Sequence, residues 1–557
     1  MLTVSDHWEQ VLTGEPKSAL ERLLPDVVRA RRWFGSKARH IRSARIVESI
    51  PIPFESTTAV LLHIQLEYGA GSPETYALPI TAAFHEEAAR IQEGLPQAVV
   101  ASITIQKDGR DLGGVLYDAL WNQGFARAIL DAIGHESRFV GITGSLQASS
   151  TGAFADLVPA DVALAPAVLN AEQSNTSVAY SGRVMLKLYR RLVPGTNPDL
   201  EIGRALTAMK FPYVAPVAGA LEYRQGSGEP MTVALAQGFI RNDGDAWQHS
   251  LNALDRYFMR VAKDTRRGRE APPVHTPLLE LAQDEYPAAA RELIGLHLQS
   301  AERLGQQTAE LHVALSQVPD DPAFTPEPLD AAYRDTRYAA MIQLARGTLA
   351  LLREREACLS VDQRILTRRL LNLASTIEEK FAEFRDLRTS VPRIRCHGDY
   401  HLGQVLCAGS DFVIIDFEGE PARPIEARRM KHPAVLDVAG MIRSFHYAGF
   451  AYLEGKLANI AVASREWPEQ CASWAQYWCD WTGAAFLKAY LRIMARGQVW
   501  PPAQDEARCL FEAYSLEKVI YELNYELNNR PDWVEIPLRG VMQILERAGG
   551  VETDRRS

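Results

Sequence analysis

The sequence has few cysteines, and none of them forms a closely spaced pair. Six cysteines are scattered through 557 residues without a CxxC motif. A disulfide framework needs many cysteines in a short secreted chain, and a structural zinc site needs closely spaced ligand pairs. The pattern therefore predicts reduced thiols and excludes both a disulfide-rich domain and a zinc-binding module.

The sequence also lacks a basic block, a long apolar run and a signal-peptide pattern. Lys and Arg total 60 against 69 for Asp and Glu, which gives a formal net charge of −9, and no basic block stands out as a footprint for the phosphate backbone of a nucleic acid. No apolar stretch approaches the roughly 18 residues of a membrane span. Residues 1–22 alternate polar and apolar side chains, unlike a signal peptide. We expect a cytoplasmic protein that contacts neither nucleic acid nor membrane.

The length of the chain predicts more than one structural unit, because 557 residues exceed what one hydrophobic core usually organises. Residues 1–90 mix helical and strand patterns, which predicts a small α+β unit. Residues 91–241 are rich in strand patterns. From residue 242 to 557, long helical periodicities dominate. The fold class that we expect is therefore α+β.

Three local patterns are the clearest. Residues 59–67 alternate as a strand does. Residues 176–180 and 184–189 predict two strands joined at Ser181-Gly182 as a hairpin. A strand-rich island at 394–417 interrupts the helical half of the chain.

This island carries the residues from which we infer chemistry. Apolar stretches at 405–406 and 413–415 predict a hairpin that brings Asp399, Gln404 and Asp416 to one end. Phosphoryl transfer needs a carboxylate to accept the proton of the attacking hydroxyl, and oxygen ligands for a magnesium ion that bridges the phosphates. A His-Gly-Asp tripeptide alone also occurs by chance as a turn cap, but the hairpin and the second aspartate favour the catalytic interpretation.

The nucleotide site is expected upstream, in the strand-rich part. Lys187 lies among apolar residues of a predicted strand, and residues 197–201 have the N-cap, Pro and acidic residues of a helix start. Glu201 on that helix could pair with Lys187. Residues 173–177 occupy the position of a phosphate-covering loop, without glycine. The alternative for Lys187 is a solvent-facing lysine beside a polar turn.

A helix predicted at 511–528 is the candidate acceptor site. Leu516, Ile520, Leu523 and Leu527 form one apolar stripe that should pack inward. Lys518, Tyr521 and Tyr525 fall on the opposite face. Tyrosine rings beside a lysine suit a sugar with C–H patches and hydroxyls, whereas the alternative is an ordinary solvated surface.

These motifs resemble those of the bacterial maltokinase family. Its catalytic stretch, His-Gly-Asp-x-His-Leu-Gly-Gln, stands at 397–404, and its metal stretch, Asp-Phe-Glu-Gly-Glu-Pro, stands at 416–421. Further similarity runs along almost the whole chain. The chain departs from the family at Tyr400, where leucine is common. The resemblance implies a two-lobed protein-kinase-like fold with an N-terminal cap subdomain, a nucleotide-binding N-lobe and a mostly helical C-lobe.

The resemblance also implies ATP and Mg²⁺ as cosubstrate and cofactor, and maltose as the acceptor. Phosphorylation at the anomeric hydroxyl would give maltose 1-phosphate. This product would feed α-glucan and glycogen synthesis. The resemblance also implies a functional association with trehalose synthase. The implied residues fall into four groups: catalytic Asp399 and His397; nucleotide-binding Lys187, Glu201, Gln173, Ser174, Asn175 and Thr176; metal-binding Gln404 and Asp416; acceptor-binding His401, Glu418, Arg443, Lys518, Tyr521 and Tyr525.

Two alternatives remain open. The catalytic stretch does not separate a maltose kinase from a kinase for glucosamine or another sugar, because the acceptor pocket is built elsewhere. Kinase folds also host non-catalytic proteins that bind a nucleotide or a sugar. The retention of Asp399, Gln404 and Asp416 favours an active enzyme over that second alternative.

Overall fold

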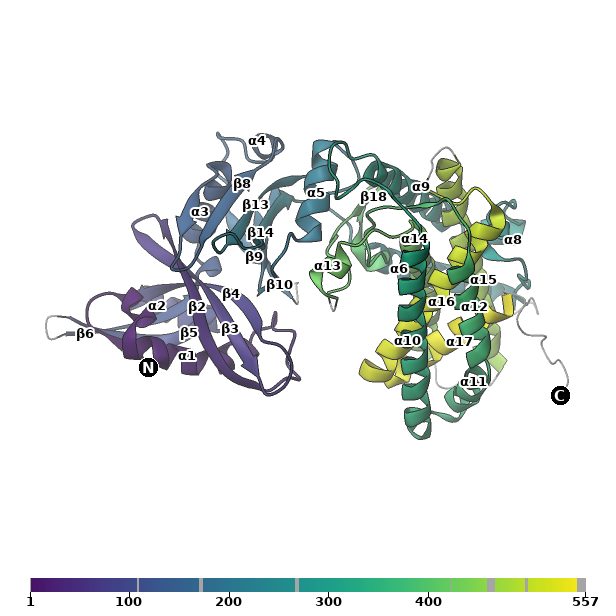
Figure 1. Ribbon diagram of the computed structural model, residues 1–557, viewed down its shortest axis with the longest axis horizontal. Coiled ribbons are helices and arrows are strands. Elements are labelled where there is room, and N and C mark those ends of the chain that lie inside the picture. The colour runs from purple at the N-terminus through teal and green to yellow at the C-terminus, as the bar shows by residue number, and fades with distance from the viewer. Residues whose placement is uncertain are drawn as a thin grey trace. The chain divides into compact units, whose positions relative to one another are not determined.

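A computed structural model describes residues 2–107, 110–169, 174–265, 270–421, 423–457, 466–495 and 499–547. The chain forms two compact units, of which the first comprises residues 1–210, 215–241 and 424–426, and the second comprises 211–214, 242–423 and 427–557. Strands gather in the purple-to-teal part of the chain and long helices in the green-to-yellow part (Figure 1). The α+β class is confirmed, whereas the boundaries at residues 90 and 241 remain predictions.

The first sheet of the first unit is built mainly from long antiparallel strands, in the order β1-β5-β6-β4-β3-β2, with β12 paired to β4. The predicted strand at 59–67 is confirmed, because it lies within β3. Helices α1 and α2 pack against strands of this sheet. The elements are β1 (Leu2–Val4), α1 (Gly14–Arg29), β2 (Ile41–Phe54), β3 (Thr57–Tyr68), β4 (Glu74–Phe84), α2 (His85–Gly94), β5 (Val99–Lys107), β6 (Arg110–Asp118) and β12 (Arg191–Leu192).

The second sheet of this unit has the order β7-β8-β13-β14-β11-β10-β9. Its helices are α3, α4 and α5. The elements are α3 (Gln123–Gly134), β7 (Arg138–Val140), β8 (Ser145–Ser150), α4 (Phe154–Leu157), β9 (Pro166–Leu169), β10 (Asn175–Tyr180), β11 (Val184–Tyr189), α5 (Pro198–Ala208), β13 (Val217–Arg224) and β14 (Met231–Gly238).

The hairpin of β10 and β11 confirms the sequence prediction. Tyr180 pairs with Val184, and the turn residues Ser181 and Gly182 have φ angles of 49° and 64°. Two consecutive positive φ values match the right-handed twist of the flanking strands, which is why glycine suits the second turn position.

The second unit is mostly helical. Its helices are α6 (Ala246–Thr265), α7 (Leu278–Leu281), α8 (Ala288–Leu293), α9 (Leu296–Ser316), α10 (Ala331–Arg355), α11 (Val361–Asn372), α12 (Ala374–Asp386), α14 (Val435–Leu457), α15 (Glu466–Met494), α16 (Gln504–Asn529) and α17 (Glu535–Arg547). The short α13 (Ile425–Arg428) lies at the junction of the two units in sequence. Two small ladders pair β15 (Glu327–Pro328) with β16 (Pro392–Arg393), and β17 (Val405–Ala408) with β18 (Asp411–Ile414).

Close packing of α9 against α15 forms part of the core of this unit. A Cβ atom at Gly305 of α9 would lie 2.0 Å from the backbone oxygen of Phe486 on α15, so only glycine allows this approach. The predicted apolar stripe of α16 is confirmed, because Leu516, Ile520 and Leu523 are all buried, as is Leu527. On the opposite face of α16, Nζ of Lys518 lies 3.4 Å from Asp399 of the 394–417 island.

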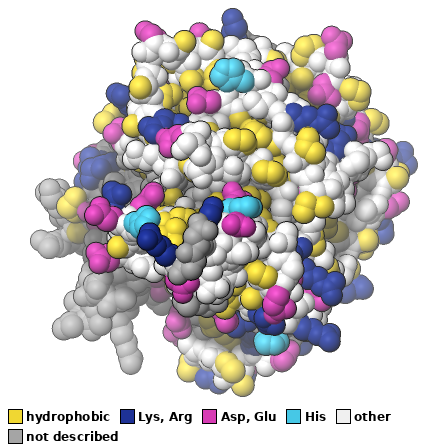
Figure 2. Space-filling model, turned by 90° about the vertical axis from the view of Figure 1, so that its left-hand side faces the viewer, with side chains coloured by type: hydrophobic (Ala, Val, Ile, Leu, Met, Phe, Trp, Pro, Cys, Tyr) yellow, Lys and Arg dark blue, Asp and Glu magenta, His cyan; other side chains and the backbone are white. Residues whose placement is uncertain are grey.

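One face of the molecule carries charges of both signs. On the face that Figure 2 shows, basic and acidic side chains are interspersed among apolar and neutral ones. Among the described helices, none combines the length and apolarity that a bilayer crossing requires.

Candidate active site

The hairpin of β17 and β18 positions the proposed metal ligands. Val405 pairs with Ile414 and Leu406 with Val413, as the sequence predicted. This register places Gln404, just before β17, beside Asp416, just after β18. The side-chain amide of Gln404 donates a hydrogen bond of 3.0 Å to a carboxylate oxygen of Asp416. The structure therefore brings together the two residues that the sequence assigned to the metal.

His397 holds the catalytic loop in place. Its ring is buried, and Nε2 lies 2.9 Å from the backbone oxygen of Ile415, next to Asp416. The backbone N–H of Asp399 points to Nδ1 of the same ring at 3.4 Å. Nε2 therefore carries the proton and Nδ1 accepts, which makes a neutral ring the form that fits both contacts. These contacts indicate that His397 positions the loop that carries Asp399.

Asp437 supports the loop from α14. Its carboxylate accepts hydrogen bonds from the backbone N–H groups of His397 and Gly398, at 2.7 and 2.9 Å, and lies 3.1 Å from Nε2 of His312. Burial alone would raise the pKa of Asp437, but His312 and these N–H groups outweigh it, so the pKa is lowered. The sequence analysis gave Asp437 no role.

A small cavity of about 30 Å³ opens beside Asp399. Lys518 lies in its wall, with Nζ 3.4 Å from Asp399 and 4.0 Å from Glu420. Burial would lower the pKa of Lys518, but these two carboxylates outweigh it and raise the pKa, so the ammonium stays charged. The Tyr521 ring centroid lies 5.1 Å from the same nitrogen. We call this cavity the acceptor cavity.

The acceptor cavity has further walls that the sequence did not reveal. Glu517 of α16 and Arg337 of α10 line it and form a buried ion pair of 2.6 Å. Tyr400, at the position where the resembling family has leucine, also lines it, and its hydroxyl lies 2.8 Å from Thr308. These partners lie far apart in sequence, so no local pattern could have identified them.

Four other residues that we expected at the acceptor are not among the described residues that line this cavity. Tyr525 is 46% exposed and lies under the Arg530 guanidinium, two turns beyond Lys518 on α16. Arg443 forms an ion pair of 2.7 Å with Glu522. Neither is among the described residues that line the acceptor cavity. Two helical turns carry a side chain about 10 Å along the axis, so Tyr525 lies apart from Lys518, and its acceptor role stays a prediction.

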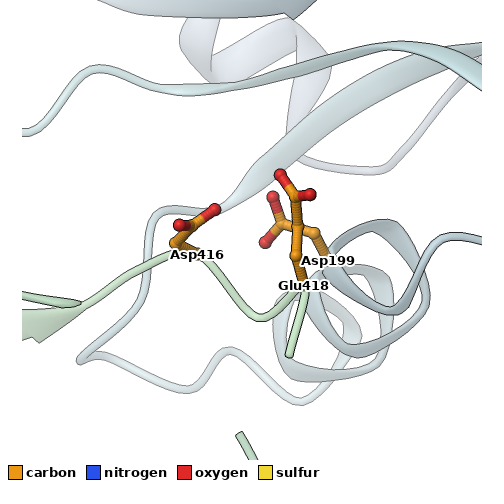
Figure 3. A group of neighbouring side chains, drawn as sticks. All are labelled: Asp199, Asp416 and Glu418. Atoms are coloured by element: carbon orange, nitrogen blue, oxygen red, sulfur yellow. The ribbon is translucent and has the colours of Figure 1, made fainter. Parts of the chain in front are cut away.

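His401 and Glu418 also have other surroundings. His401 is the N-cap of the short turn at 402–404, and its Nδ1 accepts from the backbone N–H of Gly403 at 3.1 Å. Glu418 follows Asp416 on the loop after β18 (Figure 3). A carboxylate oxygen of Glu418 lies within 4.8 Å of one of Asp416. Glu418 is therefore a neighbour of the proposed metal ligands.

This donor set fits a magnesium ion. Asp416 and Glu418 offer carboxylate oxygens, and Gln404 offers an amide oxygen, which are the hard oxygen ligands that Mg²⁺ prefers. The Gln404 amide nitrogen is already turned toward Asp416, which fixes the orientation of the side chain.

The residues that the sequence assigned to the nucleotide lie in the first unit. Lys187 of β11 is buried, and its Nζ lies 3.4 Å from Asp199 in the first turn of α5. Tyr189 also donates to this carboxylate at 3.0 Å. The sequence singled out Glu201 as the partner. The structure adds Asp199, two residues earlier, which the Asn197 N-cap positions through a bond of 2.9 Å to its backbone N–H.

The predicted phosphate-covering loop is described only in part. Gln173 lies outside the described residues. Ser174 precedes β10, and Asn175 and Thr176 begin that strand. The Thr176 hydroxyl accepts a hydrogen bond of 2.8 Å from Arg190, which in turn pairs with Asp118 at 2.6 Å. Sequence reasoning missed this buried chain of contacts.

Comparisons with known proteins find two matching families and several similar proteins. Residues 28–121 match the maltokinase N-terminal cap domain, and residues 251–422 match the phosphotransferase enzyme family. A glucosamine kinase of Mycolicibacterium smegmatis is 31% identical over 159 residues, which are 28% of this chain and 35% of that protein. A glucosamine kinase of Streptacidiphilus jiangxiensis is 26% identical over 377 residues, 67% of this chain and 72% of that protein.

Solved structures of glucosamine kinase share the fold. One, in complex with glucosamine, ADP and inorganic phosphate, has a TM-score of 0.58 at 18% identity, covering 97% of this chain and all of that chain. Another crystal form has a TM-score of 0.61 with the same coverage. These structures show the fold. The chain thus carries a maltokinase-type N-terminal cap domain at residues 28–121 and a phosphotransferase-family domain at 251–422, as the resemblance implied.

Proposed function

We propose that the protein phosphorylates a sugar at the expense of ATP, with Asp399 as the general base. The observation that carries this proposal is the position of Asp399, in the wall of the acceptor cavity and on the same loop as Gln404. The sugar hydroxyl would give its proton to Asp399 while its oxygen bonds to the γ-phosphorus, and the bond to the β-phosphate oxygen would break to release ADP.

The cosubstrate and the metal are part of the same proposal. Lys187, held by Asp199, would contact the phosphates of ATP, and residues 173–176 would cover them. Gln404 and Asp416 would hold Mg²⁺, with Glu418 beside them. The ion, when bound, would neutralise negative charge on the phosphates. The ADP in the solved glucosamine kinase supports a nucleotide cosubstrate here.

We propose maltose as the acceptor because three of the four carboxylates that line the acceptor cavity already pair with cationic side chains, and the fourth, Asp437, accepts hydrogen bonds from two backbone N–H groups. Asp399 pairs with Lys518, Glu517 with Arg337, and Glu420 with Arg423. A neutral sugar leaves these pairs intact, whereas an ammonium group would have to compete with Lys518 for the same carboxylates. The maltokinase-type cap supports the same choice. With maltose as the acceptor, we further propose a role in α-glucan supply and a functional association with trehalose synthase.

Glucosamine is the second candidate, and the comparisons favour it. Both curated relatives and the solved structures reported above carry the name glucosamine kinase. The amino group of glucosamine would meet Glu420 or Asp399 in this cavity, provided that Lys518 moves aside.

One assay separates these acceptors. ADP release would be coupled to a reporter with maltose, glucosamine, glucose, trehalose and an aminoglycoside, and kcat/KM compared. We expect maltose to give the largest value, with phosphate on the anomeric carbon by phosphorus NMR, and Asp399→Asn to remove the signal. A largest value with glucosamine would replace maltose by the second candidate. No sugar-dependent ADP release from a folded protein would contradict the kinase proposal itself.

A further inference from the structure

A cavity of about 430 Å³ lies within the first unit. It is bounded by the end of α1 and the residues that follow it, by residues 96–99, by the end of β6, and by β9 and the start of β10. Among the described residues, its walls and those of the acceptor cavity have no member in common. We call this space the Arg31 cavity.

Arg31 is a buried cation in the wall of this cavity, and it has no carboxylate partner. Its side chain is only 8% exposed. Nη2 donates to the backbone oxygens of Ala98 and Val99, at 3.4 and 2.6 Å. Nη1 donates to no group in the described part of the chain, and no described carboxylate lies within ion-pairing distance of the guanidinium. A guanidinium stays charged in proteins, so a buried one without a counter-ion favours an anion as its partner.

The charges around Arg31 leave a positive excess inside the cavity wall. Asp118 already pairs with Arg190 at 2.6 Å, and both side chains are buried. Burial lowers the pKa of Arg31, and the charge of Arg190 adds to this effect, which Asp118 opposes. Two buried guanidinium groups therefore share one carboxylate. The remaining charged side chains of the wall, Asp26 and Arg32, are exposed and opposite in sign.

The other walls suit the body of a sugar. Trp33 and Trp121 line the cavity together with the apolar side chain of Val27 and the amide of Gln97. Aromatic rings pack against the C–H patches of a sugar, and amides bond its hydroxyls. The guanidinium fork matches a phosphate, which offers three terminal oxygens to the donors of the wall, one more than a carboxylate offers.

We propose that the Arg31 cavity binds a phosphorylated sugar, at a site separate from the acceptor cavity. This site adjoins the predicted phosphate-covering loop, because Thr176 at the start of β10 lines the cavity and accepts a hydrogen bond of 2.8 Å from Arg190. A sugar phosphate is also the class of molecule that the proposed reaction would form, but the binding proposal does not depend on that reaction.

Isothermal titration calorimetry on the full chain, without ATP or Mg²⁺, tests this proposal. The probes are glucose 6-phosphate and glucose 1-phosphate, and the comparison compounds are glucose, inorganic phosphate and glucuronate. We expect one sugar phosphate to bind more tightly than all three comparison compounds. Arg31→Met keeps an unbranched side chain but removes the charge, so it should weaken this binding at least about tenfold. Trp121→Leu, a milder change at a half-buried side chain, should weaken it several-fold.

Two control variants locate the binding. Arg29→Ala removes an exposed arginine at the last residue of α1, which is not among the described residues that line the Arg31 cavity, and it should leave the binding unchanged. Lys187→Ala combined with Lys518→Ala removes one cation from the proposed nucleotide site and one from the acceptor cavity. Sugar phosphate binding should survive this double change. Melting temperatures identify any variant that fails to fold.

Three results would overturn the proposal. In the first, neither sugar phosphate binds the unmodified protein more tightly than inorganic phosphate or glucuronate does. In the second, folded Arg31→Met and Trp121→Leu bind the sugar phosphate as the unmodified protein does. In the third, the binding disappears with the double change at Lys187 and Lys518, which would assign it to the proposed kinase site. Because the readout is binding without ATP, a failure of the kinase proposal would leave this result unaffected.

Discussion

Removing the Lys518 side chain should weaken acceptor binding far more than nucleotide binding. In the acceptor cavity, Nζ of Lys518 lies 3.4 Å from Asp399 and 4.0 Å from Glu420, where a sugar hydroxyl can bridge the ammonium and a carboxylate. A hydrogen bond to a charged group contributes about 1.5–3 kcal/mol. Since about 1.4 kcal/mol is a factor of ten, Lys518→Ala should raise the KM for the acceptor about 10- to 100-fold.

The assay measures steady-state ADP release with the best acceptor. The acceptor concentration is first varied at saturating ATP, and the ATP concentration is then varied at saturating acceptor. Tyr525→Ala is a matched control, because Tyr525 lies on the same helix but is 46% exposed and outside the acceptor cavity. We expect the control to leave both KM values nearly unchanged. If folded Lys518→Ala kept the acceptor KM of the unmodified protein, or if Tyr525→Ala raised it as much, the acceptor cavity would be wrongly assigned.

Three further predictions follow from the geometry. Lys187→Ala should raise the KM for ATP and lower kcat in the ADP-release assay, since the ammonium would contact the phosphates, and a change in melting temperature alone would make Lys187 a structural residue. Asp416→Ala should abolish the Mg²⁺-dependent activity, and a titration with Mg²⁺ that still saturated normally would contradict this. His63 is buried, and burial lowers its pKa to about 4. The free energy of unfolding should therefore fall as the pH drops from about 6.5 toward 4, because the unfolded state then binds a proton that the folded state excludes. In urea-unfolding experiments across this pH range, His63→Phe should reduce that fall by about 3 kcal/mol, and an unchanged pH dependence would refute the prediction.

The sequence predicted the parts of the site that depend on local patterns. The hairpin of β17 and β18 follows from strand alternation and a short turn, and its register alone brings Gln404 to Asp416. The apolar stripe of α16 likewise follows from helical periodicity, and it orients Lys518 and Tyr521 away from the core. Both patterns hold without knowledge of distant partners.

The remaining parts of the site depend on packing between segments far apart in sequence. Tyr525 shares the face of Lys518, but periodicity does not say where along the helix the cavity ends. Arg443 of α14 meets Glu522 of α16, and Arg337 of α10 meets Glu517, across separations that no local pattern encodes. Asp199 stands in the same helical turn as Glu201, and spacing did not single it out as a carboxylate that lies 3.4 Å from Lys187.

The most direct test of the central claim is the turnover of Asp399→Asn. A general base contributes typically about 10²–10⁴-fold to the rate. The substitution keeps the size of the side chain but removes its ability to accept the proton of the sugar hydroxyl. We predict that kcat for ADP release with the preferred sugar falls by a factor in this range, while equilibrium binding of ATP and of the sugar stays nearly unchanged. A folded Asp399→Asn protein with the kcat of the unmodified enzyme would contradict the account.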